Sequence, residues 1–344
     1  MFALRTLEIV GSGADRIKAI CGHGQDQTIR KLHREMMGAI PLSSHNWLYQ
    51  TTHKLLSSIP DHIQEEFEAL AEAVGVPATG IATLNFLDEL ARLADLGRYV
   101  NPMACSSLGV FHPSEQLAIV GRNLDYGLLL PELRAESYRY HHRNHGHGYD
   151  YISWSWPGFV GVVTGLNSQG LWLATHTARS LHQSDQGVPN GILYRMIMEN
   201  ACGIEEARDI IFENLPTCAS NLMLADFRSG QVSVVEIDNC CAIFRDDQMC
   251  KGRGTYSVAC ANHFIRLEGA MTPNSYLRQY YLDSEAAKMT GAKIDPVARA
   301  MASPGILNDI TVYSLVTDGM TVLEQIGDGI ESDETRYEDS SLEI

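Results

Sequence analysis

Apolar and polar positions follow two different patterns along the chain, and the change comes near residue 102. Over residues 61–75, apolar side chains recur with the spacing of an amphipathic helix, between Pro60 at its start and Gly75 at its end. The same spacing predicts three further helices, over residues 27–37, 45–56 and 81–96. The first hundred residues are therefore expected to be largely helical.

Beyond residue 102, short apolar runs rich in β-branched and aromatic residues are separated by glycine and proline. Three such runs predict neighbouring strands of one antiparallel sheet, over residues 149–156, 159–167 and 170–178. Two helices are predicted next, over residues 189–200 and 204–214. The remaining pattern predicts strands over 220–224, 232–237, 255–259 and 311–316, and a helix over 274–288. Strands that alternate with pairs of helices are typical of a layered α+β fold.

Residues 103–127 predict a β-hairpin, with turn residues at 112–114. A hairpin of this length brings its end back beside its beginning, so Arg122 and Asp125 are expected to lie close to Cys105. A thiol beside a guanidinium and a carboxylate is a nucleophile with groups nearby that control its pKa. The alternative is a buried cysteine with a purely structural role, which is common in protein cores.

Composition and charge mainly exclude classes of protein. The formal net charge is −16 and Lys and Arg form no run, so nucleic acids and acidic membrane surfaces are poor candidate partners. The eight cysteines show no CxxC pair and no metal-ligand spacing, which favours free thiols in a reducing compartment. No apolar run is long enough to span a bilayer, and the start lacks a signal-peptide core. A cytoplasmic protein is therefore expected.

The bond between Ala104 and Cys105 suggests how such a thiol could work without a histidine base. If this peptide bond were cut, the new α-amino group would lie on the nucleophilic residue itself. The pKa of an α-amino group is near 8 and that of a thiol is about 8.5, so proton exchange between the two groups is nearly balanced. A general base would then be built into the nucleophile.

The stretch CSSLGVF…GRNLDYG resembles the cysteine N-terminal-nucleophile (Ntn) hydrolases, which include acid ceramidase, N-acylethanolamine acid amidase, choloylglycine hydrolases and penicillin acyltransferases. The likeness covers most of the chain, in the segments IPDHIQEEFEALAEAVGVPATGIATLNFLDEL, WPGFVGVVTGLNSQGL, NLMLADFRSGQVSVVEID, ACANHF and NSYLRQYYL. It implies an αββα sandwich, in which two antiparallel sheets lie between helical layers. It also implies a helical piece, residues 1–104, and a catalytic piece, residues 105–344, that together form one folded unit.

Carried over residue by residue, the resemblance implies roles for three residues of the hairpin. Cys105 would be the nucleophile and, after self-cleavage between Ala104 and Cys105, the source of the amino-group base. Arg122 would favour the thiolate, and Asp125 would orient the new ammonium group. For Arg122, as for Arg278 of the predicted helix 274–288, the alternative is an ordinary solvated surface charge.

Residues outside the hairpin complete the site that the resemblance implies. Asn262 would donate its amide N–H to the oxyanion, and Arg278 would match a second arginine of the family. Bile-salt hydrolases carry a second oxyanion asparagine where this chain has Thr175, His176 and Thr177, so the second donor stays open. The hairpin turn is one residue longer than in the family and must absorb that residue without a change of register.

A cluster of four histidines raises one other possibility. His141, His142, His145 and His147 could bind a transition metal, or they could belong to a flexible loop that is solvated or lines the substrate site. The glycines among them favour the loop. The resemblance implies neither a metal nor a cofactor.

The expected activity is hydrolysis of a linear amide in an N-acylated small molecule, with a fatty-acyl amide as the first choice, through a thioester on Cys105. One alternative is an acyltransferase, which passes the acyl group to an amine because its site excludes water from the thioester. An alternative of another class is an uncleaved binding protein on the same fold. The only partner expected is the small-molecule substrate.

Overall fold

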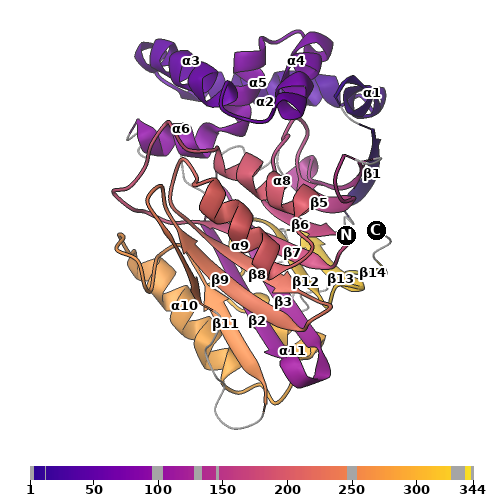
Figure 1. The fold of residues 1–344 in the computed structure, drawn as a ribbon, viewed down its shortest axis with the longest axis vertical. Coiled ribbons are helices and arrows are strands. Elements are labelled where there is room, and N and C mark those ends of the chain that lie inside the picture. The colour runs from indigo at the N-terminus through magenta and orange to yellow at the C-terminus, as the bar shows by residue number, and fades with distance from the viewer. Residues whose placement is uncertain are drawn as a thin grey trace.

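The protein is described by a computed structural model, which covers residues 4–11, 13–94, 104–127, 134–144, 147–245, 254–326 and 338–341. Two sheets face each other, and helices cover the outer face of each sheet (Figure 1). The eight-stranded sheet has the order β1 (Arg5–Val10), β4 (Tyr138–Arg143), β5 (Tyr151–Ser155), β6 (Thr164–Asn167), β7 (Leu171–Thr177), β8 (Ser220–Asp226), β9 (Gln231–Ile237) and β10 (Ala242–Arg245). The six-stranded sheet has the order β11 (Tyr256–Cys260), β2 (Ala104–His112), β3 (Leu117–Asp125), β12 (Thr311–Thr317), β13 (Thr321–Ile326) and β14 (Glu338–Ser341).

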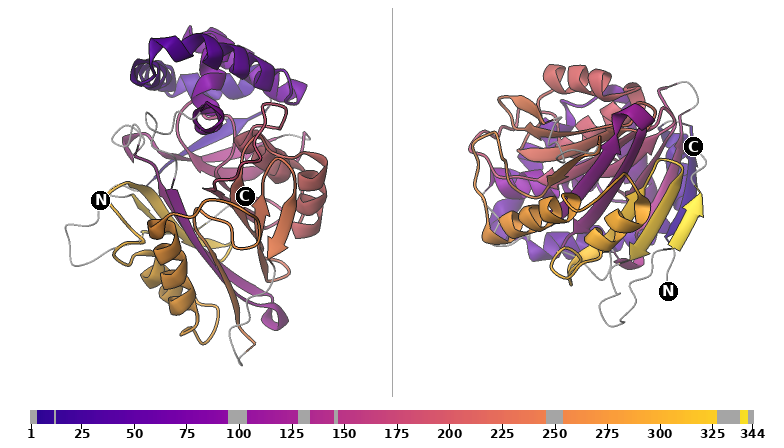
Figure 2. Two further views of the ribbon diagram at one scale, coloured as in Figure 1. Left: turned by 90° about the vertical axis from the view of Figure 1, so that its left-hand side faces the viewer. Right: turned by 90° about the horizontal axis from the view of Figure 1, so that it is seen from below.

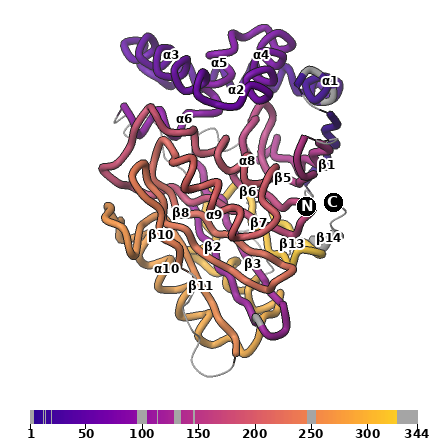
Figure 3. The backbone as a smooth tube through the Cα atoms, in the orientation of Figure 1, coloured from indigo at the N-terminus to yellow at the C-terminus, as the bar shows by residue number. Residues whose placement is uncertain are grey.

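The helices form two outer layers and a cap. The outer layers are α8 (Asn190–Asn200) and α9 (Ile204–Glu213) on the eight-stranded sheet, and α10 (Pro273–Ala286) and α11 (Ile294–Met301) on the six-stranded sheet. The cap lies at one end of the sandwich (Figures 1 and 3) and contains α1 (Ala14–Gly22), α2 (Gln25–Ala39), α3 (Leu42–Leu56), α4 (Asp61–Val74), α5 (Ala78–Asn85) and α6 (Leu87–Leu93). The αββα sandwich is confirmed. None of the described helices is long and apolar enough to cross a bilayer.

The three largest apolar clusters among the described residues hold the layers together. One core lies between the two sheets and continues into the cap, and it includes Trp154, Trp172 and Phe111. The other two lie between each sheet and its outer helices. The view from below in Figure 2 shows the sheets stacked with helices outside them. The sheets approach closely at Gly109, where an added Cβ would come within 2.6 Å of Val232, so this strand position of the central hairpin has no room for a side chain.

Sequence patterns place most elements within a few residues of their observed bounds, and the differences have physical reasons. Residues 5–10 form a strand, β1, that pairs in parallel with β4, so the N-terminal segment is not wholly helical and the sheet is not wholly antiparallel. The run 159–167 is a strand only over β6. The predicted helix 81–96 is two helices that meet at Phe86, and its last two residues lie outside the described part of the chain.

A buried network of charges joins the cap to the sandwich. Arg195 of α8 contacts Glu66 of α4 at 2.7 Å and Glu199 at 2.8 Å, and Arg16 of α1 contacts Glu66 at 3.2 Å. All four side chains are at least nine-tenths buried. Because each charge has an opposite partner, the network links three elements at a cost in desolvation that the pairing offsets.

Acid is expected to weaken this link. Burial alone would raise the pKa values of Glu199 and Glu66, but the Arg195 guanidinium outweighs burial. The pKa of Glu199 is lowered from 4.5 to about 2, and that of Glu66 is lowered as well. A carboxylate with a lowered pKa stabilises the folded state above its unfolded pKa, and that contribution is lost as pH falls. We therefore expect the free energy of unfolding, measured with urea, to decrease between about pH 4.5 and pH 2, by roughly 3 kcal/mol for Glu199 alone. The variant Glu199→Gln should show a shallower decrease, and an equal slope in both proteins would contradict the assignment.

Candidate active site

The hairpin of β2 and β3 sets the geometry of the site. Its register is unbroken, and it pairs Cys105 with Leu124 and Ala104 with Asp125. The turn at Pro113–Glu115 is followed by Gln116 with a φ of 50°, which is the only positive φ of a non-glycine residue in the described chain. The turn leaves the register of the two strands unchanged, and the expected closeness of Arg122 and Asp125 to Cys105 follows from that register.

Cys105 is fully buried at the start of β2. Burial raises the pKa of its thiol, the guanidinium of Arg122 opposes that shift, and the net pKa is raised. Arg122 is itself fully buried, and its Nη1 donates to the carbonyl oxygen of Thr175 at 2.8 Å. Its Nε and Nη2 form no hydrogen bond of normal geometry within the described part of the chain. The guanidinium nevertheless interacts with the thiol of Cys105 and the hydroxyl of Tyr313, and a buried cation beside a thiol favours an anion that develops there.

The backbone nitrogen of Cys105 is also held by polar side chains. It donates to Oδ1 of Asn262 at 2.9 Å, and Nη2 of Arg278 donates to the same oxygen at 2.7 Å. Nη1 of Arg278 donates to the carbonyl oxygen of Cys105 and, at 2.7 Å, to Ser106. Asn262 and Arg278 therefore converge on the residue that the hairpin presents, although they follow it by more than 150 positions in the chain.

The expected donor, Nδ2 of Asn262, points to the carbonyl oxygen of Thr177 at 2.9 Å. An amide NH₂ has two hydrogens, so one remains for a second acceptor. Asp125 lies opposite Ala104 and accepts hydrogen bonds from Thr311 at 2.7 Å and Asn308 at 3.0 Å. Burial raises the pKa of Asp125, and these two hydrogen bonds oppose the shift. Thr311 and Asn308 were not among the predicted site residues; their place at and just before the start of the predicted strand 311–316 is the only signal that the sequence holds for them.

Thr175, His176 and Thr177 occupy two faces of β7. The carbonyl oxygens of Thr175 and Thr177 hold Arg122 and Asn262, and both threonines line a pocket. His176 faces the interior, where its Nε2 lies 2.7 Å from Oγ of Ser107 and its Nδ1 lies 3.4 Å from Sγ of Cys260. Burial holds the pKa of His176 well below its usual value, so this ring is neutral.

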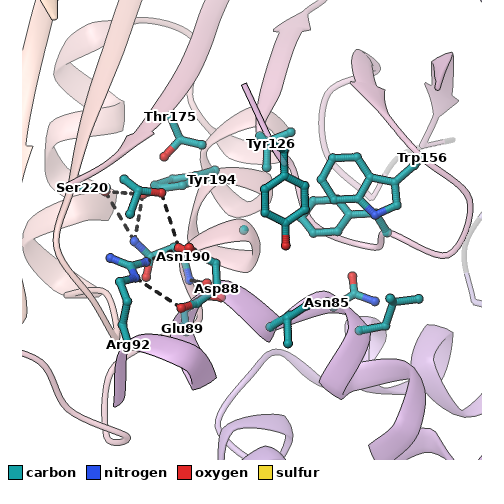
Figure 4. A pocket seen from close by; sticks show the side chains of 16 residues that line it. Asn85, Asp88, Glu89, Arg92, Tyr126, Trp156, Thr175, Asn190, Tyr194 and Ser220 are labelled. Atoms are coloured by element: carbon teal, nitrogen blue, oxygen red, sulfur yellow. Dashed lines mark hydrogen bonds and ion pairs between the residues drawn. The ribbon is translucent and has the colours of Figure 1, made fainter. Parts of the chain in front are cut away.

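A pocket lies under the cap, beside this cluster (Figure 4). Residues of the N-terminal segment form one side of it, among them Asp88, Glu89 and Arg92 of α6. The aromatic side chains of Tyr126 and Trp156 lie across from them. The pocket adjoins the cluster because Tyr126 directly follows Asp125 and because Thr175 and Thr177 belong to both. None of its acidic residues was predicted, since single charges on a helix carry no distinctive pattern.

The histidine cluster is not a single loop. His141 and His142 belong to β4, and His142 is buried between Nη2 of Arg16 and Oγ of Ser153. His145 lies outside the described residues. Within the described part of the chain, no three side chains of His, Cys, Asp or Glu come together as a metal site would require.

Structure comparison finds solved proteins that are similar to this chain, and the first of them shares its fold. A solved structure titled as the Caenorhabditis elegans ortholog of N-acylethanolamine-hydrolyzing acid amidase superposes with a TM-score of 0.50 at 17% identity, over 62% of this chain and 93% of that one. Penicillin V acylase from Agrobacterium tumefaciens gives a TM-score of 0.41 at 13% identity, over 64% of this chain and 82% of the other.

Sequence comparison identifies relatives as well. Acid ceramidase from Rattus norvegicus is 23% identical over 204 residues, which are 53% of this chain and 48% of the relative; the match thus spans about half the length of that relative. The family model for acyl-coenzyme A:6-aminopenicillanic acid acyl-transferase matches residues 111–297, more than half of the chain. That stretch contains Arg122, Asp125, Asn262 and Arg278 and begins after Cys105. The chain therefore belongs to the acyl-coenzyme A:6-aminopenicillanic acid acyl-transferase family, within the Ntn-hydrolase superfamily.

Proposed function

We propose that this protein is a self-processing cysteine amidohydrolase that cleaves a linear amide bond of an N-acylated small molecule. The observation that carries the proposal is that two polar side chains contact Cys105, one at its backbone nitrogen and one at its thiol. Its backbone nitrogen donates to Asn262, and its thiol lies beside the buried guanidinium of Arg122. A residue that only packs in a core needs neither contact. The relatives named as a ceramidase and as an N-acylethanolamine-hydrolyzing acid amidase support an amide as the substrate.

The proposed reaction starts with self-cleavage between Ala104 and Cys105. Cleavage converts the backbone nitrogen of Cys105 into an α-amino group, which accepts the thiol proton as the sulfur attacks the substrate carbonyl. Nδ2 of Asn262 stabilises the negative charge that develops on the tetrahedral intermediate. Nε and Nη2 of Arg122 stabilise the negative charge on the sulfur. The amine leaves with a proton from the same amino group, and water hydrolyses the thioester.

Asp125 and Arg278 act as positioning residues in this scheme. Asp125 lies opposite Ala104, so its carboxylate is placed to accept a hydrogen bond from the new ammonium group. Arg278 fixes the carbonyl oxygen of Cys105 and the side-chain oxygen of Asn262. Transfer of the acyl group to an amine instead of water is the second candidate, and the family model, which describes an acyl-transferase, favours it.

An acyl-enzyme trap tests the proposal. The protein is mixed with N-acyl amides of increasing chain length, quenched in acid within one turnover and weighed by intact-mass spectrometry. We expect the mass of one acyl group on the piece that begins with Cys105, and hydroxylamine should remove it because it is a thioester. Turnover without such an adduct, or no turnover of any N-acyl amide, would contradict the proposal.

Removal of the Arg122 guanidinium should slow the reaction without removing the nucleophile. For Arg122→Met we expect kcat/KM to fall by about 10²- to 10³-fold, because preorganised donors to a developing negative charge have effects of that size. Steady-state kinetics on folded protein, checked by thermal melting, measures this loss. Arg34→Met, at an exposed position of α2, is the control and should keep the wild-type rate. A loss of less than threefold in Arg122→Met would show that the guanidinium does not act on the reacting atoms.

A further inference from the structure

The pocket under the cap combines carboxylates with aromatic faces. Glu89 is fully buried on α6, and its Oε1 accepts the backbone N–H of Asn190 at 2.9 Å, while its Oε2 makes no hydrogen bond to another described residue. Asp88 lines the same pocket and supplies a second carboxylate. Across from them, the rings of Tyr126 and Trp156 are stacked with their centroids 6.2 Å apart, and Phe159 lies 4.8 Å from Trp156.

The positive charge of Arg92 is already committed to protein groups. Its Nη2 contacts Asp88 at 2.6 Å, and its Nη1 donates to the carbonyl oxygen of Ala219 at 2.6 Å. One carboxylate of the pocket is thus paired, whereas Glu89 forms no ion pair with another described residue and interacts with Arg92 only at longer range. Burial, followed by the nearby charge of Asp88, raises the pKa of Glu89 to about 7. A cation bound beside it would favour its ionised form.

The hydroxyl of Tyr126 is a second, independent sign of a ligand. Tyr126 is only 7% exposed, and its hydroxyl forms no hydrogen bond within the described part of the chain. Figure 4 shows this hydroxyl pointing into the pocket, toward α6. The hydroxyl thus offers the pocket a donor and an acceptor that no described protein group uses, and a ligand group at this place would bind to it.

We propose that this pocket binds an ammonium group of the substrate, with the carboxylates of Asp88 and Glu89 and the faces of Tyr126 and Trp156 around it. Aromatic faces attract cations, most strongly where water is excluded, and aromatic pockets recognise quaternary ammonium ligands in this way. That the bound molecule is the substrate rests on the proposed function: the pocket is lined by Thr175 and Thr177, whose carbonyl oxygens accept hydrogen bonds from Arg122 and Asn262. The pocket then narrows the substrate class to N-acyl amides that carry a positive charge.

Binding of choline to the wild-type protein tests the pocket without any need for hydrolysis. Choline and its uncharged analogue 3,3-dimethylbutan-1-ol have nearly the same shape, so titration calorimetry with both compares the charge alone. We expect choline to bind at least about tenfold more tightly. Glu89→Gln, which keeps an acceptor for Asn190, should remove most of this preference, and Glu205→Gln, at an exposed site on α9, should leave it unchanged.

A second variant and the pH dependence of binding also test the pocket. If Glu89→Gln melts too early to assay, Trp156→Leu should lower the preference through loss of the aromatic face. The preference should also rise between pH 6 and pH 8 as Glu89 ionises; the titratable groups that face it are Asp88, Arg92, Tyr126, Tyr194 and Cys218. Equal binding of choline and its analogue, or an unchanged ratio in Glu89→Gln, would overturn the proposal.

Kinetics then connects the pocket to the reaction. Decanoyl amides of (2-aminoethyl)trimethylammonium and of 3,3-dimethylbutylamine differ only in charge, and so do coumarin amides of 6-(trimethylammonio)hexanoic and 7,7-dimethyloctanoic acid. In one of these two pairs, kcat/KM should be at least about tenfold higher for the cation. Cleavage of both members at equal rates in both pairs would overturn this inference but leave the proposed function intact. Cleavage of none would contradict the proposed function, while the choline titration would still decide whether the pocket binds ammonium.

Discussion

Replacement of Cys105 by alanine is expected to abolish both self-cleavage and amide hydrolysis, with kcat/KM lowered by about 10⁴- to 10⁶-fold. In the proposed mechanism this residue supplies the sulfur and, after cleavage, the amino-group base, and no other group of the proposed site takes over either task. Cys105 is fully buried, and alanine fits its place because it is smaller than cysteine. The loss of one sulfur atom should therefore cost little stability. Activity against N-acyl amides, together with the mass of the chain, measures the effect.

Other cysteines provide the control for this prediction. Cys202 is partly exposed in the turn between α8 and α9, and Cys202→Ser should keep full activity. Cys105→Ser is informative as well, since it retains a nucleophile with a much higher pKa and should react far more slowly. Hydrolysis by Cys105→Ala at more than about one hundredth of the wild-type rate would show that the nucleophile is another residue.

Arg195→Met is expected to be the most destabilising single change, at about 3–5 kcal/mol. The methionine keeps the length of the side chain but removes the cation between Glu66 and Glu199, and two buried carboxylates are then left with Arg16 as their main buried cation. Because these residues lie on α1, α4 and α8, we expect the cap to loosen first. Urea unfolding at neutral pH gives the loss of stability, and hydrogen exchange shows where it begins.

An exposed ion pair serves as the comparison. Lys288 contacts Glu285 on α10 at the surface, and Lys288→Met should change stability by less than about 1 kcal/mol. If Arg195→Met were no more destabilising than Lys288→Met, the buried network would not be what holds the cap to the sandwich. The triple variant Glu66→Gln, Arg195→Met and Glu199→Gln should recover part of the loss, because it leaves fewer buried charges without a partner.

The layered fold and the central hairpin were predictable because they rest on local patterns. The period of apolar residues determines α4, and the turn residues at 112–114 determine where β2 and β3 meet. The interior strands β5, β7 and β9 contain β-branched and aromatic residues, and β8 has the apolar run 222–225; both faces of these strands are buried.

Elements at the edges were harder to predict because tertiary pairing decides them. β1, RTLEIV, has only two buried residues, Leu7 and Ile9, and its pairing with β4 depends on a partner more than 130 residues away. β4 itself, YRYHHR, has too many polar residues to be recognised as a strand, and it is one because Arg16 and Ser153 satisfy His142. No local pattern records such contacts.

The same distinction applies to the site. The closeness of Arg122 and Asp125 to Cys105 follows from hairpin geometry alone. The positions of Asn262 and Arg278 came from resemblance to a family, and the structure brings both to the backbone of Cys105. The roles of these residues in catalysis stay predictions. The acidic side of the pocket could not be foreseen, because it forms only where α6 packs against β7 and α8.

The central claim is that Cys105 becomes the first residue of a catalytic piece, and the intact mass of the purified protein under denaturing conditions tests it most directly. The account predicts two pieces in the wild-type protein, of 104 and 240 residues, with the second beginning at Cys105. It predicts a single uncut chain in Cys105→Ala. A wild-type chain that stays uncut from mildly acidic to neutral pH would have no free amino group at Cys105, and the proposed mechanism would be wrong.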